Sequence, residues 1–310
     1  MDAESRFRIH PSSFIIHHSS LTPPPVTTSQ RAFAMAVGGV GFQVHLPDGA
    51  WLDALAPLYA RFPLDCEPHW QVTIRHEPGL DPVPRRWIEH IGPVTRFHAD
   101  GFAGWIDLEQ RRAEVAAPGL AHGASAVERA AGYACMHALL RERNSLMLHA
   151  AGILWREQGL IASGHSGAGK TTMARLALAC GEPINDEIVI VDLAGPQPLL
   201  LSTPFLGQGT PPELARRVKR AAPATALLLL AHGSTFHLAP LAPAEAVMEL
   251  LRTNIAAVER FDSARLWMER VDQLVQAVPV YRLHFRPTAE LWDFLAAALP
   301  AAPAAAPCAS

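Results

Sequence analysis

Residues 164–171 read Gly-His-Ser-Gly-Ala-Gly-Lys-Thr, and this run is a complete G-x-x-x-x-G-K-[ST] pattern. In that pattern the glycines let successive backbone N–H groups turn inward around a phosphate, where a strand enters the loop and a helix leaves it. Both flanks fit: residues 160–163 are an apolar run typical of a strand, and residues 170–179 are typical of a helix that stops at Gly181. The sequence therefore predicts an α/β fold with an anion site at a helix N-terminus, where the helix dipole favours negative charge.

The same loop predicts a nucleotide site. The Lys170 ammonium can reach the β- and γ-phosphates, and the Thr171 hydroxyl can hold Mg²⁺. The alternative interpretation is a glycine-rich turn that matches the pattern by chance, and the two fitting flanks argue against it. The predicted nucleotide-binding residues are Gly164, His165, Ser166, Gly167, Ala168, Gly169, Lys170, Thr171 and Thr172.

Four side chains outside the loop are candidates for chemistry. Phosphoryl transfer needs a carboxylate for Mg²⁺ and a group that takes the proton of the acceptor. Asp186 and Glu187 directly precede the apolar run 188–191, so two adjacent acids can divide these roles; the alternative is a solvated turn. Asp192 closes that run and is a rival metal ligand. His149 ends the first arm of a predicted hairpin and is either a phosphate-side donor or a structural histidine.

Composition narrows the class of protein. The chain has 310 residues, of which 49% are hydrophobic, so it can bury a sizeable core. Its formal net charge of −3 gives no general attraction to nucleic acid or to an anionic membrane, and no apolar run approaches the ~18 residues of a membrane span. The four cysteines are scattered without a C-x-x-C pair, as is typical of free thiols in a reducing compartment. With no recognisable secretory signal, these features predict a cytoplasmic protein that binds neither nucleic acid nor membrane.

Changes in composition divide the chain into four parts. Residues 1–34 are rich in Ser, Thr, Pro and His and are predicted to be a disordered tail, with Met35 as a candidate translation start. Residues 36–145 are predicted to form a smaller N-terminal α/β region, and residues 146–298 the domain that carries the phosphate loop. Residues 299–310 are an Ala/Pro tract, which predicts a second disordered tail.

Periodicity and turn signals predict the elements within these parts. Two patterns of the form S/T-x-x-E predict helix starts: one at Ser125, with the helix running to Arg141, and one at Thr210, with the helix ending in the basic cluster 216–220. That cluster fits an anionic partner or, more commonly, the dipole at a helix C-terminus. Asp100-Gly101 between two alternating runs predicts a hairpin. Buried strands are predicted at 188–191 and 227–230, other strands at 42–46, 72–74, 146–155 and 278–285, and other helices at 51–59, 243–256, 258–276 and 288–298.

The order of these motifs is similar to that of a known family. The run Leu148-His149-Ala150-Ala151-Gly152, the loop GHSGAGKT, and Asn185-Asp186-Glu187 before a strand resemble the catalytic domain of bacterial HPr serine kinase/phosphorylase. The resemblance covers about residues 145–298 and is greatest to divergent HPr-kinase-like proteins associated with ribosomal-peptide and lasso-peptide tailoring. It implies a P-loop kinase fold related to phosphoenolpyruvate carboxykinase, and phosphorylation of a serine that depends on ATP and Mg²⁺.

The resemblance also implies a role for each candidate residue. Asp186 would activate the acceptor hydroxyl, and Glu187 would be its acidic neighbour and a metal ligand beside Thr171. Lys170 would bind the phosphates, and His149 would be the histidine on the phosphate side of the site.

This sequence departs from the family in three ways. His165 stands where the family has an aspartate after the first loop glycine, and Glu187 replaces the second aspartate of the acidic pair. Residues 202–207 replace a Glu/Arg/Gly-rich signature of the family. These departures argue against phosphorylase activity and against HPr as the acceptor, whereas the minimal parts of a kinase are present.

Three functions are open on the sequence alone. The leading one is an ATP- and Mg²⁺-dependent kinase that phosphorylates a hydroxyl, expected to be a serine, of a peptide or protein. The alternative is an ATP-binding regulatory or partner module without catalysis. A carboxykinase that acts on an oxo-acid is a third and has only relatedness of fold in its favour. The resemblance makes a homo-oligomer an expectation, and residues 36–145 encode no acceptor that can be recognised.

Overall fold

The computed structural model describes residues 31–80, 87–99, 101–207, 209–259 and 264–300. Residues 1–30 of the predicted N-terminal tail and residues 301–310 of the predicted C-terminal tail lie outside these ranges. The first strand, β1, begins at Ala32, so residues 32–34 of the predicted tail belong to a strand. Gly38 and Gly39, with φ of +58° and +75°, form the tight turn that pairs this strand with the next.

The N-terminal region contains a mixed seven-stranded sheet with the strand order β1-β2-β3-β7-β6-β5-β4. Its strands are β1 (Ala32–Val37), β2 (Val40–His45), β3 (Trp70–His76), β4 (Trp87–Ile91), β5 (Val94–Ala99), β6 (Phe102–Asp107) and β7 (Arg112–Ala117). The predicted hairpin is confirmed by the antiparallel pairing of β5 and β6, although Asp100 itself lies outside the described residues. Helix α1 (Gly49–Tyr59) connects β2 to β3, and the 3₁₀ turn η1 (Leu120–His122) leads into α2 (Gly123–Glu142).

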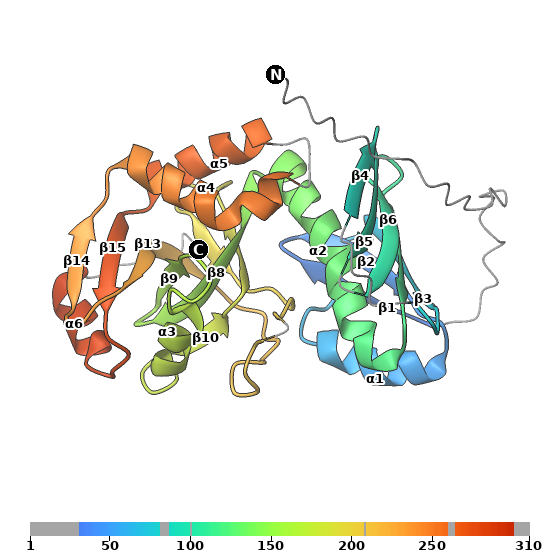
Figure 1. Ribbon diagram of the computed structural model, residues 1–310, viewed down its shortest axis with the longest axis horizontal. Coiled ribbons are helices and arrows are strands. Elements are labelled where there is room, and N and C mark those ends of the chain that lie inside the picture. The colour runs from blue at the N-terminus through green and yellow to red at the C-terminus, as the bar shows by residue number, and fades with distance from the viewer. Residues whose placement is uncertain (1–30, 81–86, 100, 208, 260–263, 301–310) are drawn as a thin grey trace, which may run out of the picture. The chain divides into compact units, whose positions relative to one another are not determined.

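Helix α2 packs against β2, β3, β6 and β7 of this sheet (Figure 1). Ala126, Ala130, Ala134 and Ala138 are buried and follow one another at a spacing of four, so they share one face of the helix. Because alanine has a short side chain, that face lets the helix backbone approach the sheet closely, and larger buried side chains of the strands fill the remaining space.

The predicted start of α2 at Ser125 is wrong. The helix begins at Gly123, and its N-cap residue His122 makes no side-chain capping bond. Glu128, which the pattern assigned to a capping box, instead forms an ion pair with Arg217 (2.6 Å) and accepts a hydrogen bond from the Leu206 backbone N–H (3.2 Å). Glu128 therefore forms a tertiary ion pair instead of the local capping bond that the pattern predicts.

The C-terminal region contains a second mixed sheet of eight strands, in the order β10-β8-β11-β12-β13-β15-β14, with β9 paired to β8 and β13. Its strands are β8 (Ser145–Trp155), β9 (Gln158–Ser163), β10 (Glu182–Asn185), β11 (Ile188–Asp192), β12 (Leu199–Leu201), β13 (Ala221–His232), β14 (His237–Pro240) and β15 (Val280–Phe285). Its helices are α3 (Lys170–Ala177), α4 (Pro243–Glu259), α5 (Ala264–Ala277) and α6 (Leu291–Ala298). The chain is thus of mixed α/β class, as expected.

Strand β13 shows why the second sheet is covered on both faces. Leu227 and Leu229 belong to the apolar cluster that includes residues of α4 and α5, whereas Leu228 and Leu230 belong to the cluster that includes residues of α3 and α6. Successive side chains of a strand point to opposite faces, so a continuous apolar run is buried on both sides. The prediction of buried strands at 188–191 and 227–230 is confirmed.

The segment before β13 contradicts the predicted helix at Thr210. Residues 211–214 form a turn, and the chain then runs without regular structure to Ala221. The predicted cap residue Thr210 donates its hydroxyl to the Asp186 carboxylate (2.9 Å) instead. The basic cluster is divided among separate partners, with Arg217 paired to Glu128, Lys219 to Asp65 and Arg220 to Glu182.

The two sheets share apolar packing. Met147 from β8, Ile190 from β11 and Phe205 belong to the same buried cluster as the side chains between α2 and the first sheet. The predicted boundary between residues 145 and 146 falls after the first residue of β8, and the apolar core continues across it. In the described part of the chain, no helix is both long and apolar enough to cross a membrane.

Candidate functional site

The phosphate loop lies where three parallel strands end. β9 runs parallel to β13, and β13 runs parallel to β15, so their carboxyl ends meet at one edge of the sheet. The loop follows β9 directly and enters α3, as the sequence predicts. His232 at the end of β13 donates from Nε2 to the Gly167 carbonyl (2.8 Å), which ties the loop to the neighbouring strand.

Two loop glycines have backbone conformations that other residues rarely adopt. Gly167 has φ +82° and Gly169 has φ +106°. A Cβ on Gly169 would also lie 2.7 Å from Phe285 Cζ, at the end of β15. The bend that turns backbone N–H groups inward therefore depends on glycine for both its conformation and its space. Within the loop, His165 and Ser166 are exposed and Ala168 is buried.

Lys170 is held inside the loop. Its side chain is nearly buried, and Nζ donates to the Gly164 carbonyl (2.8 Å) and the His165 carbonyl (3.4 Å). Burial lowers the pKa of Lys170, while the nearby carboxylates of Glu187 and Asp186 raise it. The ammonium thus lies between loop carbonyls and two acids, where it can neutralise charge on a bound anion.

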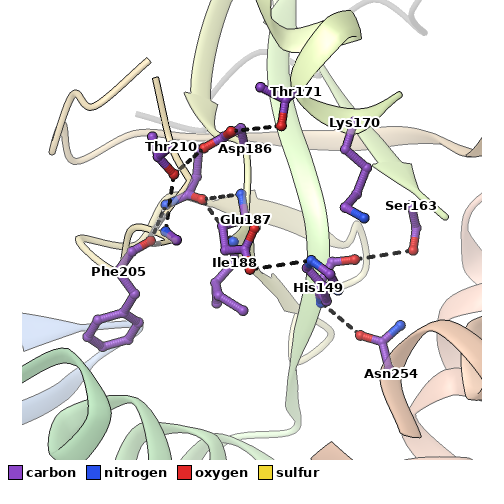
Figure 2. Close-up of polar contacts among 12 residues, drawn as sticks. His149, Ser163, Lys170, Thr171, Asp186, Glu187, Ile188, Phe205, Thr210 and Asn254 are labelled. Atoms are coloured by element: carbon purple, nitrogen blue, oxygen red, sulfur yellow. Dashed lines mark hydrogen bonds and ion pairs between the residues drawn. The ribbon is translucent and has the colours of Figure 1, made fainter. Parts of the chain in front are cut away.

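Asp186 joins the loop to a segment 24 residues further on. The Thr171 hydroxyl donates to Asp186 Oδ2 (3.1 Å), and the Thr210 hydroxyl donates to Oδ1 (2.9 Å) (Figure 2). Asp186 is 2% exposed, so the predicted alternative of a solvated turn is wrong for this residue. The carboxylate beside the Thr171 hydroxyl is thus that of Asp186, whereas the sequence analysis assigned Glu187 as the metal ligand beside Thr171.

Glu187 faces His149 rather than Asp186. The Glu187 Oε1 atom lies 3.4 Å from His149 Nε2, and Ile188 is the direct cross-strand partner of His149 (Figure 2). The hydrogen bond from His149 holds the pKa of Glu187 below its ordinary value, and the positive charge of Lys170 acts in the same direction against the effect of burial. Glu187 is therefore an ionised carboxylate at neutral pH.

The backbone of His149 is fixed by two residues that the sequence analysis did not single out. The His149 N–H donates to Asn254 Oδ1 (2.7 Å), and the Ser163 hydroxyl donates to the His149 carbonyl (3.3 Å). Asn254 lies within α4 at a non-helical φ of −122°, and its side chain is buried. A single asparagine in a helical pattern gives no signal for this contact, because its partner lies 105 residues away in the chain.

Asn185 holds the acidic pair in place. Its Oδ1 accepts from the Glu187 N–H (2.7 Å) and the Ile188 N–H (2.8 Å). Its Nδ2 donates to the Phe205 carbonyl (2.8 Å) and to the carbonyl and hydroxyl oxygens of Thr203 (3.2 Å each). The sequence marked Asn185 only as a neighbour of the acids, whereas the structure gives it the hydrogen bonds that orient them.

Asp192 lies apart from this group. It is at the far end of β11, four residues and therefore about 13 Å along the strand from Ile188. Its Oδ1 accepts from the Ser145 hydroxyl (3.0 Å) and the Ala194 N–H (3.1 Å). The geometry thus removes Asp192 from the candidate metal ligands and leaves Asp186 beside Thr171. No cluster of three or more His, Cys, Asp or Glu side chains suited to a metal occurs in the described ranges.

A pocket of about 490 Å³ adjoins the site, and His149 and Glu187 are among its lining residues. Its other lining residues come from α2, from Met147 and Leu148 of β8, from Ile188 of β11, from residues 205–207 and from Thr253 and Asn254 of α4. This volume falls within the range of small-molecule and peptide-side-chain pockets.

A scan of the chain against models of known protein families finds no match, and a search of curated proteins finds no significant relative.

Proposed function

We propose that this protein is an ATP- and Mg²⁺-dependent kinase that phosphorylates a hydroxyl group, with a P-loop kinase fold of the HPr-kinase-like type. The observation that carries the proposal is the contact between Thr171 of the phosphate loop and Asp186, next to the ionised Glu187 beside His149. A phosphate loop alone binds a nucleotide. Phosphoryl transfer requires two more groups: a carboxylate in contact with the loop hydroxyl and a second carboxylate beside it.

The residues on the donor side fit Mg²⁺ and a polyphosphate. Mg²⁺ prefers oxygen ligands and is commonly bound by one or two protein oxygens together with phosphates and waters. The Thr171 hydroxyl and Asp186 Oδ2, 3.1 Å apart, are such a pair. The two positive-φ glycines and the N-terminus of α3 suit the phosphates. Bound ATP would supply the γ-phosphoryl group, and Lys170 would neutralise the charge that develops on it.

The residues on the acceptor side suggest a division of labour that differs from the one implied by the resemblance. Asp186 is buried and already bonded to two threonine hydroxyls, so it suits the metal. Glu187 is ionised and lines the adjoining pocket, so it suits the group that takes the proton of the acceptor hydroxyl. His149 orients that carboxylate and adds a donor on the same side.

The test compares nucleotide binding with phosphoryl transfer in four single variants. The wild type should bind Mg²⁺-ATP in calorimetry and transfer radiolabelled phosphate to a serine peptide pool. Lys170→Ala and Asp186→Asn should abolish transfer. Glu187→Gln should keep the ATP affinity within a few-fold and lower transfer by about 10²–10⁴-fold, the usual contribution of a general base. Asp192→Asn is the matched control, because it removes a carboxylate at the end of β11 that lies away from the site.

The outcomes separate the two leading functions. Transfer that survives Lys170→Ala would refute the kinase. Full transfer by Glu187→Gln would refute the role of Glu187 alone. ATP binding by the wild type without transfer to any hydroxyl would favour the non-catalytic regulatory module.

A further inference from the structure

One face of α2 forms a wall of the pocket beside the proposed catalytic pair. The α2 residues that line the pocket are Ser125, Glu128, Arg129, Gly132, Tyr133 and Met136. Each of them lies three or four residues from at least two others, so they share one face. The opposite alanine face of the same helix packs on the first sheet, so the N-terminal region fixes the position of this wall.

The pocket is lined by both apolar and polar side chains; besides His149 and Glu187, the polar ones are Ser125, Glu128, Arg129, Thr253 and Asn254. Tyr133, Met136, Met147 and Phe205 contribute large apolar side chains. Methionine is flexible, so two of them let the wall adapt to the shape of a bound group. Glu128 is paired with Arg217 at 2.6 Å and adds little free charge.

The pair of Glu187 and His149, 3.4 Å apart, also lines the pocket. A group that enters the pocket therefore meets large apolar side chains and, beside His149, the carboxylate of Glu187. At the place next to Glu187, an anionic group would be repelled by that carboxylate, and a purely apolar group would leave it desolvated without a partner. A hydroxyl that donates to Glu187, carried next to an apolar group, satisfies both regions.

We propose that this pocket binds the phosphate acceptor, and that the acceptor is an uncharged hydroxyl flanked by an apolar group that contacts α2. The inference rests on the proposed kinase function and adds the location and chemical class of its acceptor. In the transfer step the acceptor oxygen forms a bond to the γ-phosphorus as the bond from that phosphorus to the ADP oxygen breaks, and the hydroxyl proton passes to the Glu187 carboxylate. The hydroxyl is that of a serine beside a bulky apolar residue or that of a free alcohol.

Gly132 offers a way to fill the pocket without disturbing the helix. A Cβ at this position would meet no atom within 4 Å, and most residues favour a helix more than glycine does. Gly132→Phe should therefore fold and occupy the pocket, and Gly132→Ala should have a smaller effect in the same direction. Gly49→Phe is the control, since Gly49 in α1 also has no atom within 4 Å of a built Cβ and does not line the pocket.

The experiment measures transfer from Mg²⁺-ATP to named probes in two arms. The peptide arm uses acetyl-Leu-Ser-Leu-amide, acetyl-Gly-Ser-Gly-amide and acetyl-Asp-Ser-Asp-amide, and the free-alcohol arm uses 1-pentanol and N-acetylserinamide. The wild type should prefer Leu flanks to Asp flanks by about 10-fold or more in kcat/KM, as expected for burial of an apolar side chain. Gly132→Phe should raise KM for the preferred probe by about 10-fold or more, with ATP affinity within two-fold of the wild type and of Gly49→Phe.

Preference for 1-pentanol over the Leu-flanked peptide would assign the acceptor as a free alcohol, and the reverse preference as a peptide serine. Equal transfer with all flanks, preference for Asp flanks, or unchanged transfer by Gly132→Phe would overturn the inference while leaving the kinase in place. ATP binding with no transfer in either arm would also overturn it. Failure of the wild type to bind Mg²⁺-ATP would be a failure of the proposed function itself.

Discussion

Replacement of Asn185 by alanine is the most informative perturbation of the site's scaffold. Asn185 is 2% exposed and is the last residue of β10, directly before the acidic pair. Its amide has two N–H donors and an oxygen with two lone pairs. The N–H groups donate hydrogen bonds to Thr203 and Phe205. The oxygen accepts hydrogen bonds from the backbone N–H groups of Glu187 and Ile188. The capacity of the side chain is therefore fully used.

The expected loss follows from that count. Each intramolecular hydrogen bond contributes a net ~0.5–1.5 kcal/mol, and a buried group left without a partner costs more than an exposed one. Loss of about four bonds at a buried site should lower the free energy of unfolding by roughly 3–5 kcal/mol. Asn185→Asp should not restore it, because it keeps the acceptor atoms but places a carboxylate against the oxygens of Thr203 and Phe205.

Urea unfolding followed by fluorescence gives the free energy, and hydrogen exchange gives the local effect. The amide protons of Glu187 and Ile188 should lose protection in Asn185→Ala before global unfolding. Thr225→Val is the control, since the Thr225 hydroxyl makes only long hydrogen bonds of 3.3 and 3.5 Å, and it should cost less than ~1 kcal/mol. If Asn185→Ala costs no more than this control, or if those two amides stay protected, the scaffold role of Asn185 is refuted.

Three further predictions concern charge, backbone and pH. Arg217→Met leaves the buried Glu128 carboxylate without its ion-pair partner and should lower the free energy of unfolding, measured in urea, by about 3–5 kcal/mol. Adding Glu128→Leu should recover part of that loss, and a larger loss in the double variant would contradict this. Gly169→Ala should destabilise the loop by at least ~1 kcal/mol and weaken ATP binding. Adding Phe285→Leu should relieve the steric clash but not the backbone strain at φ +106°. Unchanged thermal unfolding of Gly169→Ala would contradict this prediction. Burial lowers the pKa of His137 to about 4, so the unfolded chain binds this proton more readily, and stability should fall by up to ~3 kcal/mol as the pH drops from about 6.5 to 4. His137→Gln should remove that part of the pH dependence, and an identical slope in both proteins would disprove the assignment.

The sequence was sufficient for elements that are determined by neighbouring residues. The apolar runs at 188–191 and 227–230 are buried strands, and residues 94–99 and 102–107 pair as antiparallel strands of a hairpin. The phosphate loop lies between a strand and a helix, because its glycines and its flanks are consecutive in the chain. In each case the residues that determine the structure are close together in the sequence.

Both predicted capping boxes failed for one physical reason. Glu128 and Thr210 have side chains that suit a helix end, but each has a stronger partner far away in the chain: Arg217 for the first and Asp186 for the second. A buried charged hydrogen bond outweighs a local capping bond, which contributes ~1 kcal/mol. The roles of Asn185 and Asn254 were missed for a related reason, since their partners lie on other elements.

The packing of α2 explains why the phosphate loop could not indicate the acceptor. The donor side is built from consecutive residues of β9, the loop and α3. The pocket on the other side is built from α2, from residues 205–207 and from α4, and α2 is held by the first sheet through its alanine face. A piece of the chain that begins at β8 would lack α2 and would expose Met147, Ile190 and Phe205, which that core covers. The N-terminal region is therefore part of the candidate site: it completes the apolar core beneath β8 and β11, and its helix α2 forms one wall of the pocket that Glu187 also lines.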